Sequence, residues 1–136
     1  MSAARFLIDT SGLFRILQKE HRAAWSDFLT AGVIAVCPVV ELEFLFSAQS
    51  LADRLHKQRL LREVFTWIPM SERAYERAEE VQQRLTEQGA HRSAGPADLL
   101  VAATAERSGL IVLCDDRDFE TVSAVTGQPV RRVASM

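Results

Sequence analysis

Hydrophobic residues along the chain follow two spacings that alternate from one end of the sequence to the other. Short, continuous apolar runs are typical of strands buried in a sheet. These runs lie at residues 5–8, 33–36, 110–113 and 129–133. Between them, apolar residues recur every three or four positions, which predicts helices with one buried face. The predicted helices cover residues 11–18, 22–29, 39–48, 52–65, 72–87 and 97–107, with a short one from about 119. Residues 66–69 fit either a short strand or a plain connection.

Proline and glycine stand where these helices would begin and end. Pro38 and Pro96 suit the first helical turn, where a missing N–H costs no hydrogen bond. Gly32 and Gly109 follow the stretches 22–29 and 97–107 and would end these two helices. Strands that alternate with helices favour an α/β fold, in which helices cover both faces of a central parallel sheet. The length of 136 residues predicts a single domain, residues 1–136.

Composition and charge narrow the classes of function. Hydrophobic residues make up 48% and charged residues 25%, as in an ordinary folded protein. The net charge of −2 argues against a protein that coats nucleic acid by bulk positive charge. This net charge is compatible with a nuclease that binds metal ions, because bound cations restore the local positive potential that phosphate needs. No apolar run is long enough for a membrane span, and the first residues lack a signal-peptide pattern, so we expect a cytoplasmic protein.

The two cysteines, Cys37 and Cys114, each follow a short apolar run. They lie too far apart in the sequence for a CxxC redox or zinc motif. We therefore expect two buried, reduced thiols.

Two acidic positions come directly after predicted strands. Asp9 follows residues 5–8, and Asp116 follows residues 110–113 in the acidic turn 115–118. In a parallel sheet, ligands bind beyond the carboxyl ends of the strands. Each acid also has a plain structural explanation, because aspartates cap helices and occupy turns. Three aspartates within four residues would repel one another unless Arg117 or a bound cation supplied positive charge.

Two further acids stand out through their apolar surroundings. Asp98 lies in the first turn of a helix that is apolar nearly all round, so its carboxylate is expected to face the interior or a cleft. Glu43 lies within the apolar stretch 39–46, where burying an unpaired carboxylate would be costly. Glu41 is about 200° away from it around the helix, so we expect Glu41 to be a surface or salt-bridging residue.

Together, these acids match one kind of chemistry. Ligands that are all oxygen suit Mg²⁺ or Mn²⁺, and no set of His and Cys residues competes for zinc. Such ions lower the pKa of water, orient it for attack on phosphorus and stabilise the leaving oxygen. The acids in question are Asp9, Glu43, Asp98 and Asp116.

Four segments resemble PIN-domain ribonucleases, and among them the VapC-type toxins of bacterial toxin–antitoxin pairs. The segments are residues 7–11 (LIDTS), 43–48 (EFLFSA), 98–104 (DLLVAAT) and 116–119 (DRDF). The resemblance runs from Phe6 to about Val133. It implies that the four acids form the catalytic quartet, with Asp118 as an auxiliary metal ligand beside Asp9, Asp98 and Asp116. It also implies that Thr10 or Ser11 orients Asp9, water or phosphate. The chain departs from many relatives in carrying Cys114 in place of a threonine.

The resemblance further implies a metal-dependent endoribonuclease that hydrolyses RNA to a 5′-phosphate and a 3′-hydroxyl. Toxins of this group form homodimers, and a VapB-type antitoxin silences them by filling the active-site groove. The residues themselves offer apolar side chains for a partner surface, at Phe46, Leu51 and Leu55. For phosphate contacts, the candidates are Arg15, Arg92 and Arg117, together with His91.

Two other interpretations remain open at this point. One is a catalytically inactive PIN-like binding module that acts through protein partners, against which the intact quartet argues. The other is a receiver-like phosphoacceptor or a phosphatase, which would also carry aspartates at strand ends. A phosphoacceptor domain needs a lysine late in the sheet, and no lysine follows Lys57. The sequence also lacks a Walker loop.

Overall fold

The computed structural model describes residues 4–135, and strands alternate with helices along the chain. The strands are β1 (Phe6–Ile8), β2 (Ile34–Val36), β3 (Thr66–Trp67), β4 (Ile111–Cys114) and β5 (Val130–Arg132). They form one sheet in the order β3-β2-β1-β4-β5, and every neighbouring pair is parallel. The predicted central parallel sheet is therefore confirmed, and residues 66–69 begin with a short strand.

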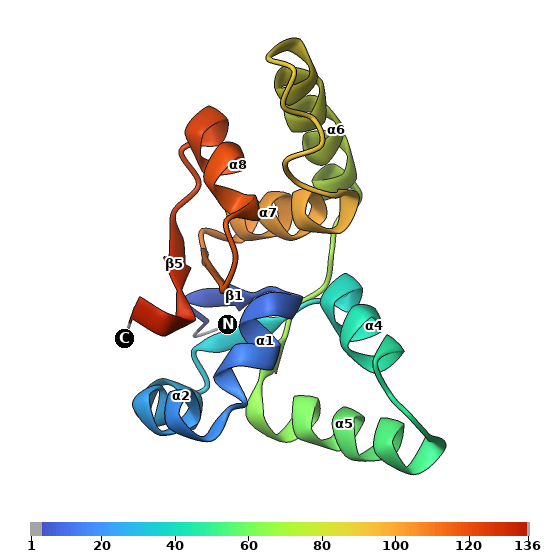
Figure 1. Cartoon of the computed structure of the whole chain (residues 1–136), viewed down its shortest axis with the longest axis vertical. Coiled ribbons are helices and arrows are strands. Elements are labelled where there is room, and N and C mark those ends of the chain that lie inside the picture. Colours follow the sequence, from blue (N-terminus) through green and yellow to red (C-terminus); the bar gives the residue numbers. More distant parts are fainter. Residues whose placement is uncertain (1–3, 136) are drawn as a thin grey trace.

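Helices cover both faces of this sheet. They are α1 (Thr10–Ile16), α2 (Lys19–Ala24), α3 (Ser26–Ala31), α4 (Pro38–Phe46), α5 (Leu51–Val64), α6 (Glu72–Glu87), α7 (Pro96–Ser108) and α8 (Asp118–Thr126), followed by the 3₁₀ helix η1 (Val133–Ser135). In Figure 1, α6, α7 and α8 lie above the sheet, and α1, α2 and α5 lie below it. Within residues 4–135, no helix is both long and apolar enough to cross a membrane.

The middle strands of the sheet bring the ends of β1 and β4 side by side. Phe6, Leu7 and Ile8 are completely buried, and burying each such side chain stabilises the fold by about 1.5–3 kcal/mol. Ile8 pairs with Leu113, and the Asp9 N–H donates to the Leu113 carbonyl at 3.0 Å. The residues that follow the two strands therefore leave the sheet at the same edge.

Helix α1 packs unusually closely on the end of β4, because Gly12 has no side chain. A Cβ added at Gly12 would lie 2.5 Å from the Leu113 carbonyl oxygen and 3.1 Å from the Cys114 Cα. Contacts below 3 Å with backbone atoms cannot be relieved without moving the strand or the helix. Gly12 thus lets the first turn of α1 approach the residues that follow β4.

The single helix predicted over residues 22–29 is wrong. The structure divides this region into α2 and α3, with Trp25 between them in a non-helical conformation (φ −98°, ψ 7°). The Trp25 side chain is completely buried, packs edge-on against Phe6, and donates its indole N–H to the Val133 carbonyl at 3.0 Å. Helical periodicity in the sequence does not reveal this tertiary contact.

The prediction that α5 presents an apolar face to the core is confirmed near the end of the helix, where Leu61 and the following Phe65 are buried and Val64 packs against the core. Leu55, nearer the start of α5, is 49% exposed and departs from this face. In Figure 1 the start of this helix extends away from the sheet. Both cysteines are buried and free, as expected. The predicted domain limits, residues 1 and 136, lie outside the described residues.

Candidate active site

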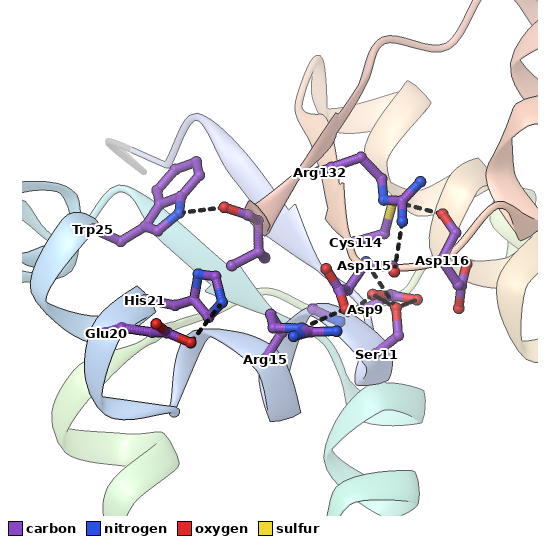
Figure 2. Close-up of polar contacts among 12 residues, drawn as sticks. Asp9, Ser11, Arg15, Glu20, His21, Trp25, Cys114, Asp115, Asp116 and Arg132 are labelled. Carbon is purple, nitrogen blue, oxygen red and sulfur yellow. Dashed lines mark hydrogen bonds and ion pairs between the residues drawn. The ribbon is translucent and has the colours of Figure 1, made fainter. Parts of the chain in front are cut away.

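Asp9 occupies the junction between β1 and α1. Its carboxylate caps α1 by accepting the Gly12 N–H at 2.8 Å, and it accepts the Ser11 hydroxyl at 2.9 Å (Figure 2). Burial raises the pKa of Asp9 to about 7. The hydrogen bonds from Gly12 and Ser11 lower this pKa, but burial has the larger effect. Repulsion from Asp116 and Asp98 raises it further. Asp9 is therefore both a helix cap and a member of an acidic cluster.

Asp98 joins this cluster from the first turn of α7. Its carboxylate accepts the Gly95 N–H at 3.1 Å, which closes the start of the helix. Burial raises the pKa of Asp98 to about 6, and repulsion from Asp118, Asp116 and Glu43 adds to the rise. Asp98 is half-buried, in line with the prediction that its carboxylate faces the interior or a cleft.

Asp116 and Asp118 lie in the turn between β4 and α8. Asp116 accepts the Asp118 N–H at 3.0 Å, so it also acts as a turn residue. Burial and then repulsion from Asp116 raise the pKa of Asp118, while a hydrogen bond with the Asp98 side chain lowers it. A hydrogen bond between two carboxyl groups needs a proton on one of them. Crowding in the cluster thus favours partial protonation.

Glu43 is exposed although it lies within an apolar stretch, so its carboxylate avoids the cost of burial. Helix α4 buries Val40, Phe44 and Leu45 and turns Glu43 outwards. The Thr10 hydroxyl donates to Glu43 Oε1 at 2.7 Å, and Glu43 adds to the repulsion at Asp98. Glu43 therefore does lie beside the cluster. The salt-bridging role expected of Glu41 is confirmed by its 3.4 Å ion pair with Arg62.

The acids have the chemistry of a divalent cation site without being assembled into one. Within residues 4–135, no three His, Cys, Asp or Glu side chains lie close enough together to hold a metal ion as they stand. The charged neighbours that act on Asp9 and Asp98 are other carboxylates, and all of them raise the pKa. Oxygen donors with uncompensated negative charge suit Mg²⁺ or Mn²⁺. The carboxylate oxygens thus fit such an ion as ligands. Hydrogen bonds at helix caps and turns hold the carboxylates of Asp9, Asp98 and Asp116.

Cys114 lies beneath the cluster at the end of β4. The side chain is completely buried, and its Sγ lies 3.7 Å from the Asp116 carbonyl oxygen. Burial, followed by repulsion from Asp9 and Asp116, raises the pKa of the thiol to about 12. Cys114 is therefore a neutral thiol at physiological pH.

The three predicted phosphate-binding arginines have different surroundings. Arg15 forms an ion pair with Asp115, with 2.5 Å between Nε and Oδ2, so its guanidinium is already engaged. Arg92, in the loop before α7, and Arg117, at the start of α8, are exposed, as is His91. The structure thus leaves Arg92 and Arg117 at the surface and ties Arg15 to the turn after β4.

Arg132 and Asp115 belong to this region and were missed as site residues by the sequence analysis. Arg132 donates from Nη2 to the Asp115 carbonyl at 3.0 Å, beside Asp116 and Cys114 (Figure 2). One signal was available in the sequence. In a parallel sheet, the carboxyl end of the last strand lies at the same edge as Asp9, and Arg132 ends that strand.

Comparison with known proteins shows a consistent set of relatives. The sequence model of the PIN domain matches residues 6–125. Ribonuclease VapC21 of Mycobacterium tuberculosis is 34% identical over 131 residues, which cover 96% of this chain and 95% of that protein. Ribonuclease VapC18 of the same species is 39% identical over 132 residues and covers 91% of each chain.

Solved structures of similar shape include VapBC and FitAcB proteins from bacteria. The DNA-bound VapBC structure from Salmonella typhimurium aligns with a TM-score of 0.76 at 17% identity, over 96% of this chain and 98% of that one. FitAcB from Neisseria gonorrhoeae aligns with a TM-score of 0.75 at 20% identity, over 96% and 99%. At such low identities the likeness concerns the fold, and it agrees with the α/β fold predicted from the sequence.

Proposed function

The chain belongs to the PIN-domain family, and on that premise we propose that it is an endoribonuclease that acts as the toxin of a type II toxin–antitoxin pair. One observation carries the proposal. Asp9, which follows β1, interacts electrostatically with acids of α7 and the β4–α8 turn, and Asp98 of α7 interacts with Glu43 of α4. The chain also aligns over most of its length with proteins named ribonucleases.

We assign the chemistry to the acids that the sequence singled out. Asp9, Asp98 and Asp116, with Asp118, would hold Mg²⁺ or Mn²⁺, and Glu43 completes the catalytic quartet. When bound, such an ion activates water and neutralises charge on the phosphate. Ser11 and the Gly12 N–H fix the orientation of the Asp9 carboxylate. Thr10 holds Glu43 at the exposed side of the cluster, where its carboxylate can accept a proton.

RNA approaches this edge from solvent. Arg92 and Arg117 are exposed and carry the charge and planar geometry that bind phosphate oxygens. Arg15 would have to leave Asp115 to do the same. We therefore assign backbone contacts with RNA to Arg92 and Arg117.

A VapB-type antitoxin is the proposed protein partner, because the similar structures include VapBC complexes. The exposed apolar side chains of α4 and α5 offer a surface for it: Phe46 is 91% exposed and Leu51 71%. A homodimer and a cytoplasmic location complete the proposal.

Expression in bacterial cells tests this function against the whole native RNA pool. The wild-type chain should arrest growth and create new RNA ends with a 5′-phosphate at a small number of sites, mapped by sequencing. Asp98→Asn should create none, because it removes one carboxylate from the quartet. Growth arrest with no new RNA ends would favour the inactive binding module. Identical ends from the variant would refute the assignment of Asp98.

A further inference from the structure

We propose that Asp115 is a positioning residue: bound by Arg15 and Arg132, it fixes the Ser11 hydroxyl and the β4–α8 turn around Asp9. The catalytic meaning of this inference rests on the proposed nuclease function. The inference assigns Arg15 a role through Asp115 in place of a phosphate contact. Figure 2 shows these residues gathered beside Asp9.

Each polar group of Asp115 is bound by a different residue. The carboxylate, in a side chain that is only 10% exposed, is paired with Arg15 of α1. The carbonyl accepts Arg132 Nη2 from β5 at 3.0 Å. The backbone N–H donates to Ser11 Oγ at 3.0 Å. Asp115 thus connects α1, β5 and the end of β4, directly before Asp116.

The bond to Ser11 determines where the serine proton points. A hydroxyl has one proton, and the Asp115 N–H already occupies an acceptor lone pair of Ser11 Oγ. The proton therefore lies towards the Asp9 carboxylate, whose oxygens are 2.9 and 3.0 Å from Ser11 Oγ. A shift of the Asp115 backbone would let Ser11 rotate and would release Asp9 from one of its two donors.

The strand that carries Arg132 is itself held from the other side. Trp25 donates to the Val133 carbonyl at 3.0 Å, and the Arg131 guanidinium lies 4.8 Å from the Trp25 ring centroid. Neighbouring residues of a strand point to opposite faces, so Arg132 points away from Trp25, towards the turn after β4. The Arg132 Nε is buried, which restricts movement of the guanidinium away from Asp115, although this atom makes no hydrogen bond with the described residues.

A double-mutant cycle on Arg15 and Asp115 tests the inference. The variants are Arg15→Met, Asp115→Asn and the two combined, each measured for Mn²⁺ affinity by calorimetry and for kcat and KM on RNA. Loss of a residue that orients a metal ligand typically lowers metal affinity or activity about 10- to 100-fold. We expect each single variant to lower both Mn²⁺ affinity and kcat about 10- to 100-fold, with little change in KM. The double variant should be no worse than either single one, because both remove the same contact.

Two comparisons separate positioning from its rivals. Arg77→Met breaks a similar partly buried ion pair with Glu106, away from the acids, and should lower thermal stability while leaving Mn²⁺ affinity unchanged. Arg117→Met removes a proposed phosphate contact and should raise KM alone. If Arg15→Met fails to fold, Arg15→Gln takes its place in the cycle.

Several results would overturn the inference. These are a rise in KM for Arg15→Met with unchanged Mn²⁺ affinity, effects that multiply in the double variant, or no binding of Mn²⁺ by the wild-type chain. If the wild type cuts RNA but the variants are additive, only the positioning role fails. If the Mn²⁺ cycle shows the coupling but no RNA is cut, the positioning role stands and the proposed nuclease function fails.

Discussion

Replacing Asp98 by asparagine should stabilise the metal-free protein while abolishing cleavage. The carboxylate is held among Asp118, Asp116 and Glu43, which repel it, and burial raises its pKa from 3.8 to about 6. Asparagine keeps an oxygen that can accept the Gly95 N–H, but it carries no charge. A residue kept for metal binding, and not for folding, is expected to show this opposition between stability and function.

The size of the effect follows from the pKa. A rise from 3.8 to about 6 corresponds, at about 1.4 kcal/mol per pKa unit, to a cost of about 3 kcal/mol for the ionised folded state at pH 7. The neutral amide also loses water when it is buried, which offsets part of the gain. We therefore expect Asp98→Asn to raise the free energy of unfolding by about 1–2 kcal/mol in EDTA at pH 7.

Urea unfolding in EDTA at several pH values measures this gain. Because the folded-state pKa is raised, wild-type Asp98 is protonated in the folded chain below about 6, and the advantage of the variant should disappear as the pH falls towards 4. Asp53→Asn is the matched control: its carboxylate has a lowered pKa because it is paired with Lys57, so the same change should slightly destabilise the chain. Added Mn²⁺ should stabilise the wild type and not Asp98→Asn. A variant that is less stable than the wild type in EDTA at pH 7 would refute the reasoning.

Three further predictions use the same preparations. Gly12→Ala should lower the free energy of unfolding by about 1–3 kcal/mol, because its Cβ would lie 2.5 Å from the Leu113 carbonyl oxygen; Gly95→Ala, with 3.8 Å to Asp98 Oδ2, should cost less, and equal losses would contradict the packing argument. In EDTA, the wild-type free energy of unfolding should fall as the pH rises from 5 to 7, because Asp9, with a pKa of about 7, takes up a proton on folding; a rise over this range would be the wrong sign. Thr10→Val should lower kcat about tenfold with little change in thermal stability, since it removes the hydrogen bond to Glu43, and an unchanged kcat would exclude this role.

Sequence reasoning identified the candidate site mainly through the topology of the sheet. Once the apolar runs are taken as parallel strands, the residues after them must meet at one edge, which brought Asp9 and Asp116 together. The role of each acid was ambiguous in the sequence, because its position fits both a helix cap or turn residue and a metal ligand. Asp9 caps α1 and Asp98 closes the start of α7, yet each also repels the other carboxylates. A cap and a metal ligand have the same sequence signature.

The failures have a common physical cause. Apolar spacing shows which residues share a face of a helix, but it does not show whether another element covers that face. Glu43 is exposed for this reason, although it lies within an apolar stretch. The Asp115–Arg132 contact joins the last strand to the turn after β4, and only the assembled sheet brings them together. The break at Trp25 likewise depends on a tertiary contact with η1.

Cleavage of total bacterial RNA by the purified chain is the most direct test of the central claim that the clustered acids cut RNA with a divalent ion. The wild type and Asp53→Asn should produce discrete fragments in Mn²⁺ or Mg²⁺ and none in EDTA, whereas Asp98→Asn should be inactive under every condition. Cleavage that persists in EDTA, or that Asp98→Asn retains at the wild-type rate, would contradict the account.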